Sequence, residues 1–218
     1  MRIVLGSRSP RRLELLKLLV PGDCINVCPP QNADEAGFDD LSTLPEFAQR
    51  ILEITQAKAD DVIQQLDPAT LIDDVLVLVA DTTVVVTDAA GRAISLGQPP
   101  LTDDWSQTVR AWFHDYFAGQ THVVLSGVSV IRMSARDGQR NSRQRVCRTS
   151  VTMRSDVERW LDWYLSTDEP IGKAGGYAIQ GAASLFVTKL EGSYSNVMGL
   201  PLEETLEMLR ELGAVSVG

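Results

Sequence analysis

Three arginines and two serines lie close together near the start of the chain, in an arrangement suited to holding an anion. The segment Ser7–Arg12 reads Ser-Arg-Ser-Pro-Arg-Arg and follows the short apolar run Ile3–Leu5. Ser9 is a favourable N-cap and Pro10 fits the first helical position, so a helix is predicted to start here. A helix N-terminus attracts phosphate, and arginines in a first turn are otherwise unfavourable. The segment therefore favours an anion site, with an exposed basic turn as the alternative.

The second candidate is Asp81, which directly follows the apolar run Val75–Ala80. Such a run predicts a strand that is buried on both faces. A carboxylate at this place is costly unless it is paired, hydrogen-bonded or bound to a metal. Ligands of α/β sheets bind beyond the carboxyl ends of strands. Asp81 is therefore a candidate general base toward water or a ligand of Mg²⁺, and an aspartate that only caps a turn is the alternative.

The third candidate is Lys58, in a segment with helical periodicity. It lies four residues after Ile54 and four before Val62, in line with the apolar face of that helix. This spacing directs the side-chain stem toward the body of the protein. A lysine whose ammonium reaches back to solvent is the alternative.

Two further segments carry weaker signals. Glu35 belongs to an acidic stretch between predicted elements, which by itself favours an ordinary solvated loop. The glycine-rich segment Gly172–Gly181 contains Lys173 and Gln180, and glycines at this density permit close backbone approach to a ligand or serve only as turns.

The elements that must position these residues alternate between helical and strand patterns. Capping boxes are predicted at Thr43–Glu46 and at Ser155–Glu158. The basic segment Arg136–Arg148 is interpreted as a solvated hairpin loop around Asp137-Gly138. Helices are predicted at 10–20, 43–66, 102–117, from 155 to beyond 160, and 201–213, and strands at 3–5, 75–87 (interrupted at 81–83), 123–133, 146–153 and 184–190. The order predicts an α/β fold with a mixed sheet.

Composition restricts the function classes. The chain has 218 residues and a net charge of −9, which argues against non-specific nucleic-acid binding. No apolar run is long enough to span a bilayer, and three cysteines without metal-ligand spacing predict reduced thiols in the cytoplasm. The two histidines lie near no Gly-X-Ser-X-Gly elbow, which disfavours a nucleophilic triad.

Taken together, these segments resemble the Maf family of nucleoside triphosphate pyrophosphatases nearly from end to end. The family's opening motif Ser-X-Ser-Pro-Arg-Arg is present, as are its later Ala-Asp-Thr and Lys-Ala-Gly-X-Tyr-X-Ile-Gln-Gly motifs. The matching segments are Gly6–Leu16, Asp34-Glu35, Lys58-Ala59, Ala80–Thr82, Lys173–Gly181 and Gly192–Pro201. The Lys-Ala-Gly-Gly-Tyr-Ala-Ile-Gln form is similar to that of the branch acting on dTTP and UTP.

The resemblance implies a fold and a chemistry. The fold is an elongated α/β molecule, similar to the inosine-triphosphate pyrophosphatases, with a mixed sheet and a cleft between two lobes in one domain, 1–218. The chemistry is hydrolysis of a nucleoside triphosphate to the monophosphate and pyrophosphate with Mg²⁺ or Mn²⁺. Family members often dimerise, so a homodimer is also expected.

The resemblance also assigns expected roles to residues. Asp81, Glu35 and Lys58 are the expected catalytic residues, with Glu35 and Asp81 holding the metal or the attacking water. The expected substrate-binding residues are Ser7, Arg11, Arg12, Thr82, Gln98, Lys173 and Gln180. Among these, Arg11, Thr82 and Gln180 match positions linked to the choice of base.

Two departures from the family pattern keep other functions open. Gln98 stands where the family usually has a lysine, and Gly172 stands where it usually has an aspartate before Lys-Ala-Gly. The segment 136–146 is a candidate loop insertion. The alternatives are a nucleotide-binding regulator of septum formation with little turnover, and a pyrophosphatase that removes modified nucleotides.

Overall fold

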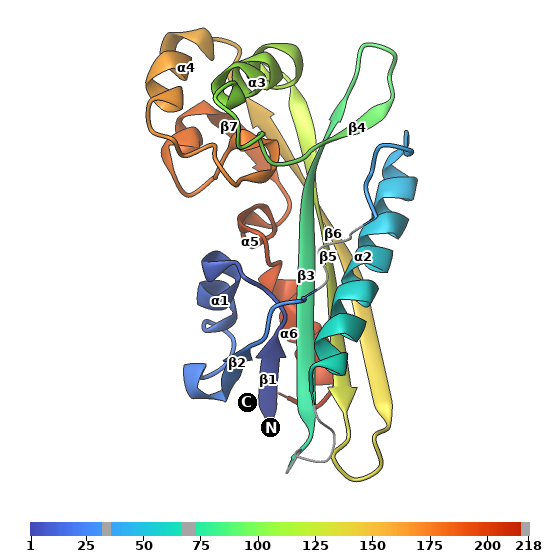
Figure 1. Cartoon of the computed structure of the whole chain (residues 1–218). Coiled ribbons are helices and arrows are strands. Elements are labelled where there is room, and N and C mark those ends of the chain that lie inside the picture. Colours follow the sequence, from blue (N-terminus) through green and yellow to red (C-terminus); the bar gives the residue numbers. More distant parts are fainter. Residues whose placement is uncertain (32–35, 67–72, 215–218) are drawn as a thin grey trace.

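The computed structural model describes residues 1–31, 36–66 and 73–214 and shows an elongated molecule built on one mixed sheet (Figure 1). The α-helices of this part are α1 (Pro10–Leu16), α2 (Leu44–Gln64), α3 (Trp105–Trp112), α4 (Glu158–Leu165), α5 (Tyr194–Met198) and α6 (Leu202–Glu211). The strands are β1 (Arg2–Leu5), β2 (Ile25–Val27), β3 (Val75–Thr87), β4 (Ala93–Leu96), β5 (Thr121–Met133), β6 (Arg140–Met153) and β7 (Val187–Glu191). The predicted fold class is confirmed.

Long strands give the molecule its length. The sheet order is β2-β1-β3-β5-β6-β7, and β4 pairs with β3. β1 lies parallel to both β2 and β3, whereas β5 pairs antiparallel with β3 on one side and with β6 on the other. The antiparallel strands run through the whole molecule, and the shorter elements gather at their two ends (Figure 1).

The shorter elements form two lobes. The lower lobe holds β1, β2, α1 and α6, and the upper lobe holds β4, α3, α4 and β7, with α5 between them (Figure 1). The upper lobe has an aromatic core that includes Phe113, Phe117, Tyr164 and Phe186. The lower lobe packs α1 and α6 on one face of the sheet, and α2 covers the opposite face. Each end of the sheet is thus anchored by its own apolar cluster.

Local signals start two helices as predicted. Ser9 caps α1, and its hydroxyl accepts from the backbone N–H of Arg12 at 3.4 Å. Thr43 precedes α2, and its backbone N–H donates to the Glu46 carboxylate at 2.9 Å. Both patterns satisfy N–H groups at or just before a helix start, and so they specify where the helix begins.

The prediction that β3 is interrupted at 81–83 is wrong. The strand continues to Thr87, and Asp81 pairs with Gly127 of β5 in an unbroken antiparallel register. Opposite Asp81, the glycine lets α2 lie close over β5, since a Cβ on Gly127 would lie 2.9 Å from the carbonyl oxygen of Ile51. Asp81 is therefore a mid-strand residue rather than the end of a strand.

The predicted hairpin with Asp137-Gly138 in its turn is confirmed, but the prediction that the loop extends through the basic segment is wrong. The turn spans only 134–139, and β6 starts at Arg140 and pairs with β5 from there to Thr152. Arg143 and Arg145 both bind the carboxylate of Glu211, at 2.6 and 2.8 Å. The arginines are thus exposed side chains of a strand, which polar composition alone does not distinguish from a loop.

Two boundaries in the upper lobe differ from the predictions. The capping box at Ser155 does not form: α4 begins at Glu158 without a side-chain cap, and the Glu158 carboxylate pairs with Arg110 at 3.4 Å instead. Residues 182–186 form a 3₁₀ helix rather than the start of a strand. The Glu169 carboxylate accepts from the N–H groups of Ala182 and Ala183 and so stabilises that turn. Among the described residues, no helix combines the length and hydropathy that a bilayer-spanning segment requires.

Candidate active site

The candidate site lies at a gap along one edge of β3. On this edge β1 pairs with β3 only as far as Leu78, and β4 pairs with it only from Val84 onward. Within the described ranges no strand pairs with this edge of β3 between Leu78 and Val84. The chain leaves the sheet at Gly6, whose N–H donates to the carbonyl of Leu78 at 2.8 Å. A Cβ on Gly6 would lie 2.5 Å from Val79, so glycine allows the turn to Ser7 to pass close to β3.

Side-chain alternation sends two neighbouring residues at this gap to opposite faces of the sheet. Asp81 is in phase with Val77 and Val79, which pack beneath α2. Thr82 is in phase with Leu78 and Ala80, which face the lower-lobe core. Because the gap is open to both faces, a single ligand site can contact both side chains.

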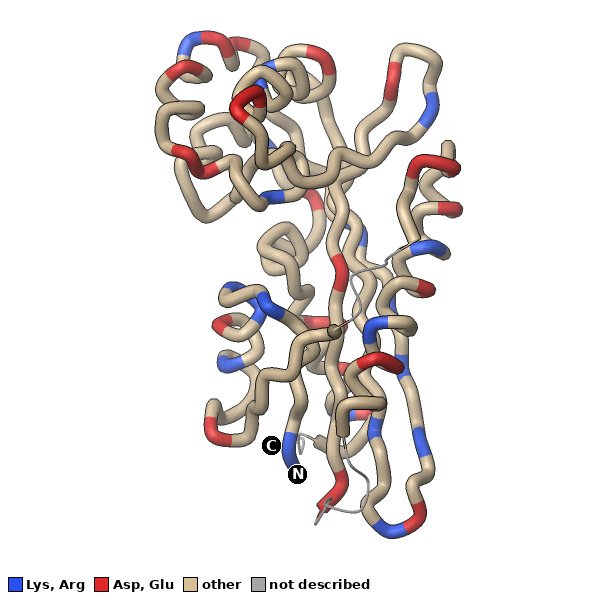
Figure 2. The backbone as a smooth tube through the Cα atoms, in the orientation of Figure 1, with Lys and Arg blue, Asp and Glu red and all other residues tan. Residues whose placement is uncertain are grey.

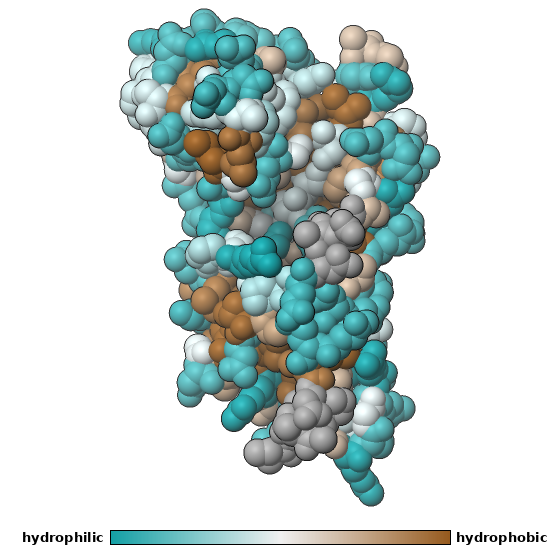
Figure 3. Space-filling model, viewed as in Figure 1, coloured by the Kyte–Doolittle hydropathy of each residue, from teal (hydrophilic) through white to brown (hydrophobic). Residues whose placement is uncertain are grey.

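A cavity of about 340 Å³ occupies the gap. Its polar and charged lining residues are Ser7, Arg8, Ser9, Arg11, Arg12, Lys58, Asp81, Thr82 and Gln98. Four cations and one carboxylate thus face this cavity among the described residues, although the whole chain is acidic. Figure 2 shows basic segments at the start of α1 and an acidic segment halfway along β3. The space-filling view shows the surface hollowed between the two lobes, with hydrophilic residues beside the hollow (Figure 3).

Lys58 and Asp81 form an ion pair at the floor of the cavity. The Lys58 ammonium lies 2.6 Å from Oδ1 of Asp81, and both side chains are only 14–16% exposed. α2 directs Lys58 toward β3 as its helical spacing predicts, because Ile54 and Val62 on the same face are buried. The pair thus holds one carboxylate oxygen of Asp81 in place beside the cavity.

Arg12 is oriented by groups from three separate segments. Its Nε donates to the carbonyl of Gly199 at 2.9 Å, and its Nη2 donates to Oγ1 of Thr82 at 3.2 Å. Its Nη1 donates to Oγ of Ser7 at 3.4 Å. These contacts link the β1–α1 turn, β3 and the residue after α5. The guanidinium therefore has a set orientation in the cavity wall.

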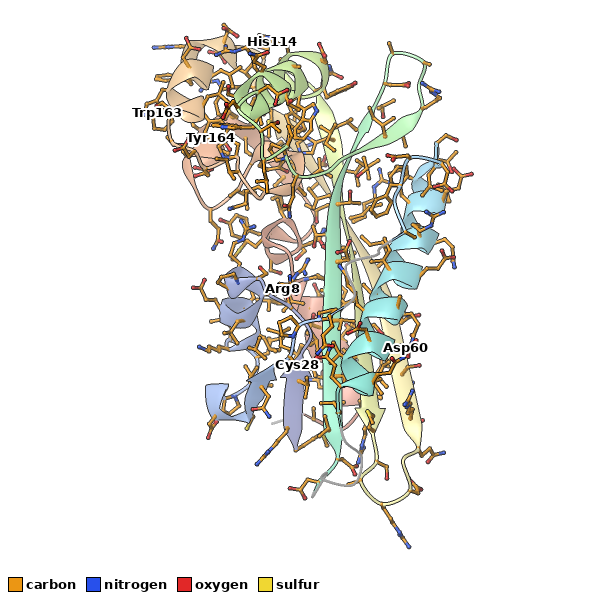
Figure 4. All side chains as sticks on the ribbon, viewed as in Figure 1. Arg8, Cys28, Asp60, His114, Trp163 and Tyr164 are labelled. Atoms are coloured by element: carbon orange, nitrogen blue, oxygen red, sulfur yellow. The ribbon has the colours of Figure 1, made fainter. Side chains whose placement is uncertain are left out.

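The rest of the turn before α1 adds groups suited to anions. Ser7 is buried, and its Oγ also accepts from the N–H of Ser9 at 3.1 Å. Since this oxygen accepts twice, its hydroxyl hydrogen can be donated to a ligand. Arg8 lies at the top of α1 below the upper lobe (Figure 4). Together with Arg11, it places two exposed or half-exposed cations at the mouth of the cavity.

The upper lobe provides the opposite wall. Gln98 follows β4, and the N–H of Gly175 donates to the carbonyl of Gly97 at 2.9 Å, which braces Gln98 against the glycine-rich loop. Tyr177 of this loop lines the cavity, and its hydroxyl lies 2.8 Å from Nε2 of His122. Burial lowers the pKa of His122 to about 3, so this histidine is neutral near pH 7. The wall is therefore anchored in the core of the upper lobe.

The structure does not bring all the predicted residues into the cavity. Lys173 lies at its edge, between the lining residues Gly172 and Ala174, and donates to the carbonyl of Ile171 at 3.3 Å. Burial and the charge of Arg11 lower the pKa of Lys173, which indicates that these two cations are near each other. Gln180 is exposed and does not line the cavity. Glu35 lies outside the described residues.

Sequence reasoning missed several lining residues. Arg8 belonged to the recognised basic turn, so its position in that turn was a usable signal. The apolar lining residues are Val84, Val124, Ala174, Tyr177, Val197 and Met198. Four of them lie within the Lys173–Gly181 and Gly192–Pro201 motifs, so membership of a motif was a usable signal. Val84 and Val124 had no such signal, because an apolar side chain in a strand is expected in the core.

The donor set of the cavity fits Mg²⁺ that is shared with a phosphorylated ligand. No cluster of three histidine, cysteine or acidic side chains is found among the described residues, so they offer no all-protein cage. Asp81 does supply a carboxylate beside four cations able to hold phosphate. Mg²⁺ characteristically binds through one or two carboxylates together with substrate phosphates and waters.

Comparison with known proteins agrees with this geometry. The family described as Maf-like protein matches residues 2–212, and the chain therefore belongs to that family. A dTTP/UTP pyrophosphatase of Syntrophus aciditrophicus (strain SB) is 38% identical over 215 residues, which cover 99% of this chain and 92% of the relative. The dTTP/UTP pyrophosphatase of Nitrosospira multiformis is 39% identical, covering 96% and 94%. That of Anaeromyxobacter sp. (strain Fw109-5) is 37% identical, covering 97% and 90%.

Proposed function

We propose that this protein is a nucleotide pyrophosphatase that hydrolyses dTTP and UTP to the monophosphate and pyrophosphate. The observation that carries the proposal is the cavity at the gap in β3, where four cations face one carboxylate. The names of the relatives supply the substrate class. The family match over residues 2–212 supports a single functional domain of two lobes.

Asp81 is the proposed general base. A water oxygen attacks the α-phosphorus and passes a proton to the Asp81 carboxylate. The bond from the α-phosphorus to the bridging oxygen breaks, and its electron pair leaves with pyrophosphate. Lys58, at 2.6 Å, keeps Asp81 turned toward the cavity. Positioned carboxylates of this kind typically accelerate proton transfer by about 10²–10⁴-fold.

The cations neutralise the charge that develops on the leaving pyrophosphate. Arg12 is the best-oriented of them, because its guanidinium is held from three sides. Arg11 and Arg8 add charge at the mouth, and the Ser7 hydroxyl donates to a phosphate oxygen. Preorganised donors act strongly because they need not reorient as the reaction proceeds.

A divalent metal, Mg²⁺ or Mn²⁺, completes the proposed site. Asp81 would hold it together with Glu35 and the substrate phosphates. When bound, the metal withdraws charge from the phosphate oxygens and helps to activate water.

Base selection is assigned to Arg11, Thr82 and Gln180, and further substrate contacts to Gln98 and Lys173. Thr82 lines the cavity with Arg11. Lys173 lies at the edge of the cavity, whereas the assignment of Gln180 rests on the matching motif of the glycine-rich loop. Three free thiols support a cytoplasmic location. β7 pairs with β6 only over Ser150–Met153, and the outer edge of the rest of β6 supports a homodimer, to be tested by light scattering.

A panel of natural and modified triphosphates with Mg²⁺ or Mn²⁺ tests the activity. Pyrophosphate release from dTTP and UTP is expected, with slower release from the purine nucleotides. In ¹⁸O-labelled water the label is expected in the monophosphate, because attack at the β-phosphorus would place it in pyrophosphate. Absence of pyrophosphate release from every substrate would refute the proposal.

A second candidate function is nucleotide binding without turnover, as in a regulator of septum formation. Gln98 favours it, because a neutral amide lines the cavity where family members usually carry a lysine. Calorimetry that shows tight triphosphate binding by a protein with negligible turnover would support this function. Rapid turnover that is abolished by Asp81→Asn would exclude it.

A further inference from the structure

Ser126 is a buried serine that touches the site without lining it. It lies on β5 directly opposite Thr82 of β3 in the antiparallel register. The two side-chain oxygens are 2.8 Å apart, and the Ser126 residue is 0% exposed. Thr82 lines the cavity, whereas Ser126 lies behind it. Ser126 can therefore influence a ligand through its contact with Thr82.

The donors and acceptors around Thr82 set the direction of its hydroxyl. A guanidinium can only donate, so Oγ1 of Thr82 must accept from Nη2 of Arg12. The hydroxyl hydrogen of Thr82 then needs another acceptor. Oγ of Ser126 is the nearer acceptor at 2.8 Å, whereas the carbonyl of Gly199 is 3.4 Å away, so the shorter distance favours donation to Ser126.

The chain of hydrogen bonds continues beyond Ser126. Having accepted from Thr82, the Ser126 hydroxyl donates to the backbone carbonyl of Asn196, 3.5 Å away. Asn196 is itself fixed, because its Nδ2 donates to the carbonyl of Val124 at 3.1 Å and to Oγ1 of Thr149 at 3.0 Å. The chain of hydrogen bonds therefore runs from Arg12 through Thr82 and Ser126 into the core.

We infer that Ser126 is a positioning residue for Arg12, acting through the hydroxyl of Thr82. By accepting the Thr82 hydrogen, it keeps the oxygen lone pairs of Thr82 directed at the guanidinium. Because Ser126 is fully buried, water does not readily replace its oxygen when the hydroxyl is removed. The kinetic consequence rests on the proposed function, since it assumes that Arg12 holds substrate phosphates.

The test replaces Ser126 with alanine and uses Ser129→Ala as the matched control. Ser129 lies on the same strand, is also 0% exposed, and its Oγ has no hydrogen-bond partner within the described part of the chain. Ser126→Ala is expected to raise the KM for dTTP by about three- to tenfold, the loss typical of one hydrogen bond. Its kcat is expected to fall by no more than a similar factor, because Arg12 also neutralises charge on the leaving pyrophosphate while Asp81 and Lys58 are untouched. Ser129→Ala is expected to leave the KM unchanged.

A purely structural role would give a different pattern. If a variant only loses folded protein, its apparent kcat falls while its KM stays constant. Thermal unfolding of both variants measures any such loss of stability. In a Thr82→Val background, Ser126→Ala is expected to raise the KM no further, because the link to Arg12 is already broken. An equal KM for wild type and Ser126→Ala, or a full additional increase in the Thr82→Val background, would overturn the inference.

A second measurement separates this inference from the proposed function. The Nε–H signal of Arg12 in ¹⁵N NMR spectra of the ligand-free protein, assigned with Arg12→Lys, reports how firmly the guanidinium is held. Ser126→Ala is expected to speed its exchange with water by about three- to tenfold, and Ser129→Ala is expected to leave it unchanged. If wild type releases no pyrophosphate, the proposed function fails and this exchange alone decides the inference. Equal exchange in both variants refutes it.

Discussion

Replacing Asp81 with asparagine preserves the side-chain shape at the gap in β3 but removes its charge and its ability to take a proton. Among the described residues the cavity then contains four cations and no carboxylate. Turnover is expected to fall by about 10²–10⁴-fold, the usual contribution of a general base. Metal-free triphosphate binding is expected to strengthen, because the removed charge repels phosphate.

The size of this gain follows from Coulomb's law. A unit charge at ~6 Å from a phosphate charge contributes roughly 1–2 kcal/mol at an effective dielectric between those of water and a protein surface. That corresponds to about five- to thirtyfold tighter binding. The gain is expected to shrink at high salt, since a cavity open to water is screened. Mg²⁺ is also expected to reduce it, because Asp81→Asn removes a proposed metal ligand.

The same change weakens the pair with Lys58. At 2.6 Å and about 15% exposure, the pair lies between a surface and a buried ion pair. A stability loss of about 1–3 kcal/mol is expected, which lowers Tm by roughly 2–4 °C per kcal/mol at this chain length.

Steady-state kinetics, calorimetry in EDTA and thermal unfolding measure these three effects. Asp60→Asn is the matched control, because Asp60 lies on the outer side of α2, away from the cavity (Figure 4). It is expected to resemble wild type in turnover and binding. Turnover of Asp81→Asn above a tenth of wild type, or weaker binding in EDTA, would refute the assignment of Asp81 as a base within a cationic site.

Three other predictions concern the cavity walls and the upper-lobe core. Gln98→Lys adds a cation to the lining and is expected to lower the KM for dTTP by about three- to tenfold at low salt and less at high salt; an unchanged KM at low salt would contradict this. Gly175→Ala is expected to be more destabilising than Gly172→Ala in urea, because both have φ near +70° but only at Gly175 would a Cβ meet Val84, at 3.0 Å. Equal urea midpoints would refute the steric argument. Burial lowers the pKa of His122 from 6.5 to about 3. Between pH 3 and pH 6.5 the unfolded chain therefore binds more protons than the folded chain, and the free energy of unfolding falls as the pH falls. From pH 7 to 5, wild type is expected to lose about 2 kcal/mol more than His122→Gln in urea unfolding, and parallel pH profiles would exclude this linkage.

Elements that depend on local signals were predictable from the sequence. Ser9 and Pro10 predict the start of α1, and Thr43 with Glu46 predicts the start of α2, because each cap is made by residues within one helical turn. At Ser155 the same reasoning failed, since the helix begins only at Glu158 and the Glu158 carboxylate pairs with Arg110 rather than closing a capping box. A predicted capping interaction competes with other partners that packing brings close to the same side chain, and the sequence does not show which interaction is the stronger.

Longer-range pairing was less accessible. The polar residues of 140–145 were assigned to a loop, yet they pair with β5 along their length. When one face and one edge of a strand are exposed to solvent, its residues need not alternate between apolar and polar. The composition of such a strand therefore resembles that of a loop. For Gln180, the motif resemblance predicted a ligand contact, whereas the side chain is exposed outside the cavity.

The sequence by itself determined the family, the α/β class and the charged groups that gather at the cavity, since these follow from residue types and short motifs. Only the tertiary structure decided how those groups meet. The pairing of β3 with β1 ends at Leu78 and its pairing with β4 begins at Val84, which leaves one edge of β3 open between them. Asp81 and Thr82 then face opposite sides of the sheet and meet Lys58 and Arg12, respectively. These contacts join residues 23 and 70 positions apart, so they depend on strand register and packing rather than on any local pattern.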